Sequence, residues 1–411
     1  MSLSNLTVDG DRLIHRLEEL AKIGALEGGG CCRLALSEED RQGRDRVVGW
    51  MRDLGLAVSI DGIGNVIGIR AGSEDGPPVM VGSHIDTVRT GGIYDGCLGV
   101  IAGLEVIQTL NDAGITTRRP LAVAFFTNEE GARFAPDMMG SAVHQGFLDL
   151  DEALAVTGID GTVVGEELQK ISYCGDAETG HFRAHCFIEM HVEQGPVLDA
   201  EGTAIGVVEG VQGISWTELV IGGVSNHAGT TPMRMRCDAA VVSARIAVEA
   251  RSIAEDMGGD QVATAGVVEV APGLVNVVPN RALMTVDLRN TDERLLQQAE
   301  ARLFSYADKV ASDEGATIER RTLARFAPVD FAPEMTDLIE KIAKGQDLST
   351  RRMPSGAGHD AQMFAPNCPT AMIFVPSRDG ISHNIEEFTK PGDIQAGANV
   401  LLHVVLEKAE S

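Results

Sequence analysis

A histidine and two aspartates follow a short apolar run near residue 80. Residues 79–81 form the core of a predicted buried strand that ends in His84 and Asp86. A turn marked by two glycines and then Asp95 come next, before a predicted helix. Polar groups of this kind are costly to bury without partners, and histidines with carboxylates are common ligands of divalent metals. Two interpretations stay open at this point, a metal site and an ordinary polar loop.

Two further apolar runs end in the same types of side chain. The run at 120–127 leads into Glu129 and Glu130, and the run at 184–192 contains His191 near its end. In open parallel sheets, ligands bind beyond the carboxyl ends of the strands. Three predicted strands that deliver such groups to one edge favour a metal centre over a polar loop.

Glu129 and Glu130 are adjacent, and adjacent side chains along a strand point to opposite sides. In a loop beyond a strand, one of them can bind a metal while its neighbour faces a substrate. Metal-assisted hydrolysis needs such a pair, with one carboxylate as a ligand and one as a general base for water. A solvated acidic pair is the alternative interpretation.

The elements that would position these residues alternate between apolar strands and helices. Helices are predicted at 38–55, 99–113 and around 140–155, which indicates an α/β domain with a mostly parallel sheet covered on both faces. Between residues 212 and 327 the pattern changes to alternating strands with two long helices, which is typical of an α+β sandwich. We therefore predict a catalytic domain formed by residues 1–211 and 328–411, with an inserted domain at 212–327.

The composition indicates which binding partners and which cellular location to expect. The 411 residues include 34 Lys and Arg against 60 Asp and Glu, a net charge of −26 that disfavours nucleic acid and anionic membranes. The seven cysteines are scattered and form no CxxC motif, which predicts a reducing, cytoplasmic location. The first residues lack a signal-peptide pattern, and no apolar run approaches the ~20 residues of a membrane span.

The segments SHIDTV, GGIYDG, NEEGARF and HVEQGP occur in this order, together with SNHAGTTPM, VNVVPN, DLRNTDE, MPSGAGHDA and ISHN. This set resembles the metal-dependent aminoacylase/carboxypeptidase superfamily, and within it the hydantoinase/carbamoylase branch. The resemblance implies an amidohydrolase that removes the carbamoyl group of an N-carbamoyl-L-amino acid, with amino acid, carbon dioxide and ammonia as products. Allantoate or ureidoglycolate is the alternative substrate, and a dipeptidase or aminoacylase is disfavoured. A non-catalytic relative is also disfavoured, because every implied ligand and the base are present.

The resemblance further implies two divalent cations, which can be zinc, manganese, cobalt or nickel. The implied metal ligands are His84, Asp95, Glu130, His191 and His383. Asp95 would bridge both ions. His84 and His191 would complete the ligands of one ion, and Glu130 and His383 those of the other. Glu129 would be the general base, and Asp86 would orient the imidazole of His84. His359 and Asp360 look metal-like, but we interpret them as loop scaffolding.

The implied substrate contacts are Gln194, His227, Asn276, Arg289 and the backbone near Gly358. Arg289 lies on the mostly polar face of a predicted strand, where its planar guanidinium suits a substrate carboxylate. A salt bridge from Arg289 to Asp287 or Asp292 is the alternative. His227 would polarise the scissile carbonyl. The branch also implies a homodimer through the inserted domain, which would act as a lid, with His227 reaching the site from the neighbouring subunit or after domain closure.

Overall fold

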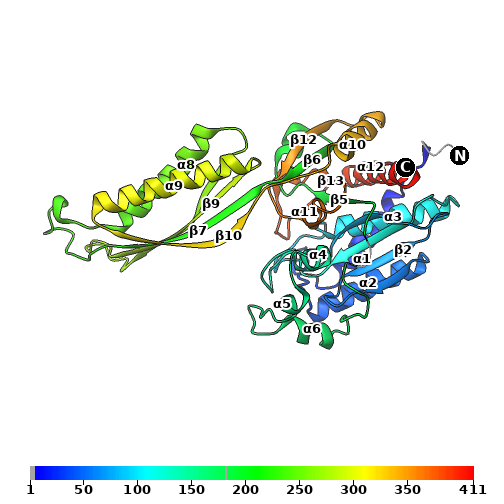
Figure 1. Cartoon of the computed structure of the whole chain (residues 1–411), viewed down its shortest axis with the longest axis horizontal. Helices are drawn as coiled ribbons and strands as arrows, with labels where there is room; N and C mark the ends of the chain where they lie inside the picture. The colour runs from blue at the N-terminus through cyan, green and yellow to red at the C-terminus, as the bar shows by residue number, and fades with distance from the viewer. Residues whose placement is uncertain (1–4, 181–182) are drawn as a thin grey trace. The chain divides into compact units, whose positions relative to one another are not determined.

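The computed structural model describes residues 5–180 and 183–411 of the chain. These residues divide into two compact units, which Figure 1 shows with their elements labelled. The first unit is Met1–Gly210 with Asp330–Ser411, and the second is Val211–Val329. Among the described residues, no helix combines the length and hydrophobicity that a membrane crossing requires.

The first unit is built on a nine-stranded sheet with the order β1-β2-β4-β3-β5-β13-β6-β11, in which β12 also pairs with β6. The strands are β1 (Ala57–Ile60), β2 (Val66–Arg70), β3 (Val79–His84), β4 (Leu121–Phe126), β5 (Cys186–Val192), β6 (Ile205–Val211), β11 (Val329–Asp330), β12 (Thr350–Ser355) and β13 (Thr370–Val375). The central strands β4, β3, β5 and β13 are mutually parallel. This arrangement confirms the predicted α/β class.

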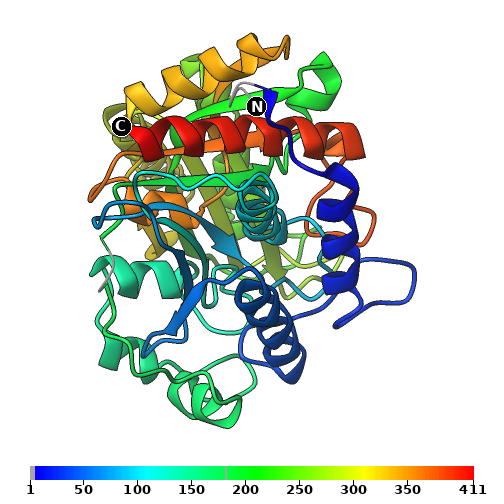
Figure 2. The ribbon, with the colours of Figure 1, turned by 90° about the vertical axis from the view of Figure 1, so that its right-hand side faces the viewer.

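Helices cover both faces of this sheet. Those of the first unit are α1 (Gly10–Ala21), α2 (Glu38–Asp53), α3 (Cys97–Asp112), α4 (Met139–Gln145), α5 (Leu150–Leu154), α6 (Val164–Lys170), α7 (Val197–Glu201), α10 (Pro333–Gly345), α11 (Asp360–Phe364) and α12 (Pro391–Glu410). Ile188 and Met190 of β5 belong to the core that α3 and α12 cover, and α12 is the red helix in Figure 2. Phe187, which comes immediately before Ile188 in β5, stacks on Phe364 of α11 at 4.0 Å between ring centroids. Burial on both faces explains why these strands are apolar throughout.

The predicted helix around 140–155 is instead two helices, α4 and α5. Gly146 ends α4 in the left-handed conformation, with a φ of 80° that glycine adopts without strain. Strands β6 and β12 and helix α11 were not predicted.

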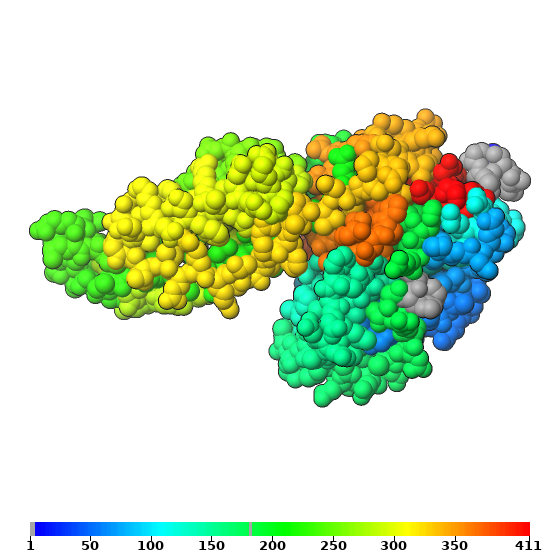
Figure 3. Space-filling model, viewed as in Figure 1, coloured from blue at the N-terminus to red at the C-terminus, as the bar shows by residue number. Residues whose placement is uncertain are grey.

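The second unit is a four-stranded antiparallel sheet in the order β10-β7-β9-β8, covered by two helices. Its elements are β7 (Gly213–Gly222), α8 (Ala239–Met257), β8 (Val262–Ala271), β9 (Arg281–Asn290), α9 (Glu293–Glu314) and β10 (Thr317–Phe326). Every second side chain of β9 from Ala282 to Leu288 is buried under the helices, as the alternation predicts. On the face of this unit that Figure 3 shows, α9 and β10 are drawn in yellow.

Candidate metal centre

Three side chains meet at the carboxyl ends of the parallel strands. His84 is the last residue of β3, His191 lies near the end of β5, and Asp95 lies in the loop before α3. Asp95 Oδ1 is 3.6 Å from His84 Nε2 and 3.1 Å from His191 Nε2. These donor atoms are close enough to one another to bind one metal ion.

A second group uses the other oxygen of Asp95. Asp95 Oδ2 is 3.4 Å from His383 Nε2, and that nitrogen is 3.3 Å from Glu130 Oε2. Asp95, Glu130 and His383 are therefore also placed to bind a metal ion. The structure thus brings together all five predicted ligands, and the two groups share Asp95.

The two buried imidazoles are oriented as metal ligands usually are. Nδ1 of His84 lies 2.9 Å from the carbonyl oxygen of Asp86, and Nδ1 of His191 lies 2.8 Å from the carbonyl oxygen of Val192. A carbonyl only accepts, so each Nδ1 carries a hydrogen and each Nε2 is the nitrogen that faces Asp95. The Gly96 amide nitrogen also lies 3.0 Å from His191 Nε2. This donor set fits divalent metals that accept nitrogen and oxygen ligands.

Asp86 acts differently from the prediction. Its carboxylate Oδ1 is 4.0 Å from His84 Nδ1, and the imidazole instead donates to the Asp86 main-chain carbonyl. The carboxylate accepts the backbone amides of Glu129, at 3.2 Å, and Glu130, at 3.3 Å. Asp86 therefore fixes His84 through its main chain and the glutamate pair through its side chain.

Glu129 is buried beside the first group, with its Oε2 3.3 Å from His84 Nε2. Burial raises the pKa of Glu129 well above its usual value, and the charges of Asp360 and Glu130 raise it further. Burial lowers the pKa of His84, but Glu129 and Asp95 outweigh it and hold that pKa well above its usual value. A metal at Nε2 displaces the imidazole proton, and its charge would stabilise the carboxylates.

Gln194 and Gly358, both predicted substrate contacts, also lie in the first unit. Gln194 has a left-handed φ of 59°, and its side-chain amide donates to Asp95 Oδ2 at 2.8 Å. Gly358 lies against the side chain of Met138, where a Cβ atom would come within 3.0 Å of the methyl group. The structure thus places Gln194 directly at the shared ligand.

His359 lies in a third group of potential donors, with Glu189 and His191. His359 Nε2, however, is 2.8 Å from the hydroxyl of Ser355. The two oxygens of Glu189 accept the Ser83 hydroxyl, at 2.6 Å, and a backbone amide of α11, at 2.8 Å. Partners that fix these side chains support the interpretation of His359 as scaffolding.

His227 and Asn276 lie in neighbouring loops of the second unit. The Ala228 amide donates to the Asn276 carbonyl at 2.9 Å, and His227 bridges to Val277 across the two loops. Nδ1 of His227 accepts the backbone amide of Gly229 at 3.0 Å. Both predicted residues are exposed to solvent.

Arg289 lies near the C-terminal end of β9, whereas the loop of Asn276 precedes the start of this strand. It pairs with Asp287 at 2.9 Å, and its guanidinium lies 5.7 Å from the ring centroid of Trp216. Arg281, where β9 begins after the Asn276 loop, is eight residues away, or roughly 27 Å along an extended strand. Within one chain, Arg289 is therefore remote from the loops of His227 and Asn276.

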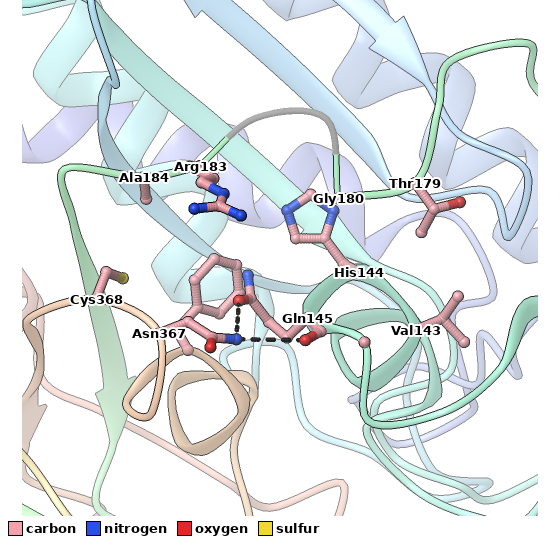
Figure 4. Close-up of a pocket in the computed structure, with 11 residues that line it drawn as sticks. Val143, His144, Gln145, Thr179, Gly180, Arg183, Ala184, Asn367 and Cys368 are labelled. Carbon is pink, nitrogen blue, oxygen red and sulfur yellow. Dashed lines mark hydrogen bonds between the residues drawn. The ribbon is translucent and has the colours of Figure 1, made fainter.

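A cavity of 340 Å³, shown in Figure 4, lies outside this centre. Its lining residues include His144, Gln145, Arg183 and Asn367, and among the described residues none of those predicted for the site lines it.

Three residues that contact the ligand loops were not predicted. Glu387 and Ser382 lie within hydrogen-bond distance of the Asp95 segment. The buried Arg33 donates to the carbonyl of Ile85, between His84 and Asp86, at 2.7 Å. Glu386 and Glu387 form a second adjacent glutamate pair soon after His383, and this pair could have indicated a role for Glu387. Nothing in the sequence distinguishes Arg33.

Comparisons with known proteins identify the family of this chain. The model of peptidase family M20/M25/M40 matches residues 80–407. The N-carbamoyl-L-amino-acid amidohydrolase of Rhizobium meliloti is 40% identical over 407 residues, which cover 99% of this chain and 98% of that protein. A ureidoglycolate hydrolase of Oryza sativa subsp. japonica is 31% identical over 412 residues, which cover 96% and 84% of the two chains.

Among solved structures, an amidase of the hydantoinase/carbamoylase family from Burkholderia multivorans has a TM-score of 0.96 at 44% identity and covers 99% of each chain. The chain belongs to peptidase family M20/M25/M40, and its likeness to hydantoinase/carbamoylase amidases confirms the branch predicted from the motifs. Metal dependence follows from the family and agrees with the donor groups around Asp95.

Proposed function

We propose that this protein is an amidohydrolase of linear amides that removes the carbamoyl group of an N-carbamoyl-L-amino acid. The observation that carries the proposal is the pair of donor groups that share Asp95, with Glu129 beside His84. The close relative that is named for this activity supports the choice of substrate.

Two divalent cations would occupy the centre, and zinc, manganese, cobalt and nickel all suit its ligands. One would be held by His84, Asp95 and His191, and the other by Asp95, Glu130 and His383. When bound, they would polarise the carbonyl and lower the pKa of the attacking water.

Glu129 moves the proton in this proposal. Its carboxylate accepts a proton from the water that adds to the carbamoyl carbon. It then delivers that proton to the amino-acid nitrogen as the carbon–nitrogen bond breaks. The amino acid leaves, and the remaining carbamate decays to carbon dioxide and ammonia. The position of Glu129 beside His84 and the hydrogen bond from its amide to Asp86 suit a group that must hold and release one proton in a fixed place.

Recognition of the substrate would come from both units. Arg289 and Asn276 would bind the substrate carboxylate, His227 would polarise the carbonyl, and Gln194 and the backbone at Gly358 would be further contacts. The separation of Arg289 from the Asn276 loop along β9 supports a homodimer, in which a second copy supplies His227 and Asn276. The inserted unit would be both the lid and the dimer contact.

Mixed dimers test this arrangement. His227→Ala and Glu129→Gln subunits, each nearly inactive alone, would form a hybrid with one complete site. A random equal mixture would then recover about a quarter of the wild-type rate. No recovery, with hybrids shown to form, would mean that His227 acts within its own subunit.

A substrate panel tests the reaction itself. The full chain, reconstituted with each candidate cation, is assayed for ammonia release from N-carbamoyl-L- and D-amino acids, allantoate and ureidoglycolate, and for cleavage of dipeptides. We expect the highest kcat/KM on an N-carbamoyl-L-amino acid. Faster turnover of ureidoglycolate or allantoate would favour the alternative, which the ureidoglycolate hydrolase relative supports. Preference for a dipeptide would contradict both. The cytoplasmic location stays a prediction.

A further inference from the structure

Glu387 is a buried carboxylate in the loop that carries His383, and it is 6% exposed. Its Oε1 accepts the backbone amides of Tyr94 and Asp95, each at 3.2 Å. Its Oε2 accepts the hydroxyl of Ser382 at 3.1 Å. One side chain thus ties the His383 loop to the segment that precedes α3.

The contact extends to the side chain of Asp95. The hydroxyl of Ser382 lies 3.2 Å from Asp95 Oδ2, in addition to its contact with Glu387. A hydroxyl has a single proton, so Ser382 links the two carboxylates by donating to one of them at a time. Glu387 therefore contacts the main chain of Asp95 directly, and it is linked to the Asp95 carboxylate through the hydroxyl of Ser382.

The glycine turn before Asp95 makes room for this carboxylate. A Cβ atom at Gly92 would lie under 3.0 Å from the Glu387 side chain. Of the Gly91-Gly92 pair, the second residue is therefore small because Glu387 occupies the space beside it. The turn and the carboxylate fit each other, although 295 positions separate them in sequence (387 minus 92).

We propose that Glu387 is a positioning residue that sets Asp95 between the two cations, an inference that rests on the proposed dinuclear centre. Asp95 must present Oδ1 to His84 and His191, and Oδ2 to His383. A rotation of Asp95 removes one oxygen from its group, so both cations depend on the orientation of this residue. Loss of an outer hydrogen-bond partner of a metal ligand costs about 10- to 100-fold in affinity.

The experiment measures cation affinity rather than turnover. The full chain is stripped with a chelator and titrated with Zn²⁺ against a chromophoric competitor. Glu387→Ala removes both acceptors, and we expect affinity to fall about 10- to 100-fold. Glu387→Gln keeps a carbonyl oxygen for the two amides, so its loss is smaller. Glu386→Ala and Glu386→Gln are the matched controls, because Glu386 is adjacent and exposed, and they leave affinity unchanged.

The unfolding midpoint of each metal-free variant separates positioning from folding. Weaker binding by a Glu387 variant that is fully folded at the titration temperature supports the proposal. Equal affinity of the Glu387 and Glu386 variants overturns it, as does a loss no larger than the unfolded fraction explains. Failure of the wild-type chain to bind two ions would instead refute the dinuclear centre itself. The wild-type titration therefore distinguishes the two failures.

Discussion

Gly96 is the position where a single methyl group should damage the metal centre most directly. The residue precedes α3 with a φ of 62° and a ψ of −50°, a positive-φ conformation that L-residues rarely adopt. A Cβ atom there would lie under 3.0 Å from Cε1, Nε2 and Nδ1 of His84. His84 is buried and held by the Asp86 carbonyl, so it has little freedom to withdraw. We therefore expect Gly96→Ala to displace either the imidazole or the Asp95 segment.

The cost of Gly96→Ala has two parts. An L-residue with left-handed φ loses about 1–2 kcal/mol of stability, and forced overpacking costs about 1–3 kcal/mol more. The sum is about 2–5 kcal/mol. Gly114, just beyond the other end of α3, provides the matched control, because its φ is 66° but a Cβ atom there meets nothing within 4 Å. Gly114→Ala should therefore show only the first part.

Urea unfolding of both metal-free variants measures these energies, and Zn²⁺ titration measures the effect on the centre. We expect Gly96→Ala to lose more stability than Gly114→Ala by about 1–3 kcal/mol, and to bind the cation at least about tenfold more weakly. Gly114→Ala should bind as the wild type does. If both variants lost the same stability and kept wild-type affinity, the prediction that the close approach of Gly96 to His84 makes Gly96→Ala more costly would be wrong.

Two further predictions concern single glutamates. Glu129→Gln should keep both the fold and cation binding and lose about 10²- to 10⁴-fold in kcat; near-normal turnover would refute its role as the base. Burial raises the pKa of Glu167, but hydrogen bonds from Arg133, at 2.8 Å, and from Lys170 outweigh burial and lower that pKa below its unfolded value near 4.5. The ionised Glu167 therefore stabilises the fold fully above the unfolded pKa, and this stabilisation is lost as pH falls through the lower folded pKa. The unfolding midpoint of Glu167→Gln should therefore fall less than that of the wild type on acidification from about pH 6 to about pH 3, and parallel curves would contradict this.

The sequence was informative where local pattern decides structure. The apolar strands that end in His84 and His191 are buried on both faces, so their composition alone marked them. The direction of parallel strands then predicted that their ends would meet, and the contacts with Asp95 show that they do. The end of a predicted strand also placed Glu129 and Glu130 at this edge, and the motif resemblance then chose Glu130 as the ligand. His383 was placed by the resemblance alone, because a loop has no periodicity from which to infer position.

What the sequence did not predict depends on tertiary packing. Asp86 and Glu387 accept hydrogen bonds from backbone amides of distant segments. Nearly every residue type has the same backbone amide, so the sequence does not reveal which amides will be partners. A pattern can show that a carboxylate follows a histidine, but not which amides it will meet. For the same reason Asp86 was assigned to the imidazole of His84 rather than to the glutamate pair.

These carboxylates explain how irregular loops can form a rigid site. Gln194 and His383 both have left-handed φ values, 59° and 53°, and both contact Asp95. Each such residue costs about 1–2 kcal/mol and persists only where its surroundings fix it. The Ser377 hydroxyl accepts the Gln194 amide at 3.0 Å. Asp86 and Glu387 fix neighbouring loops, each by accepting two consecutive amides. Four ligand-bearing segments are thus held by buried carboxylates through hydrogen bonds to backbone amides, which gives the loops fixed contacts besides those to the cations.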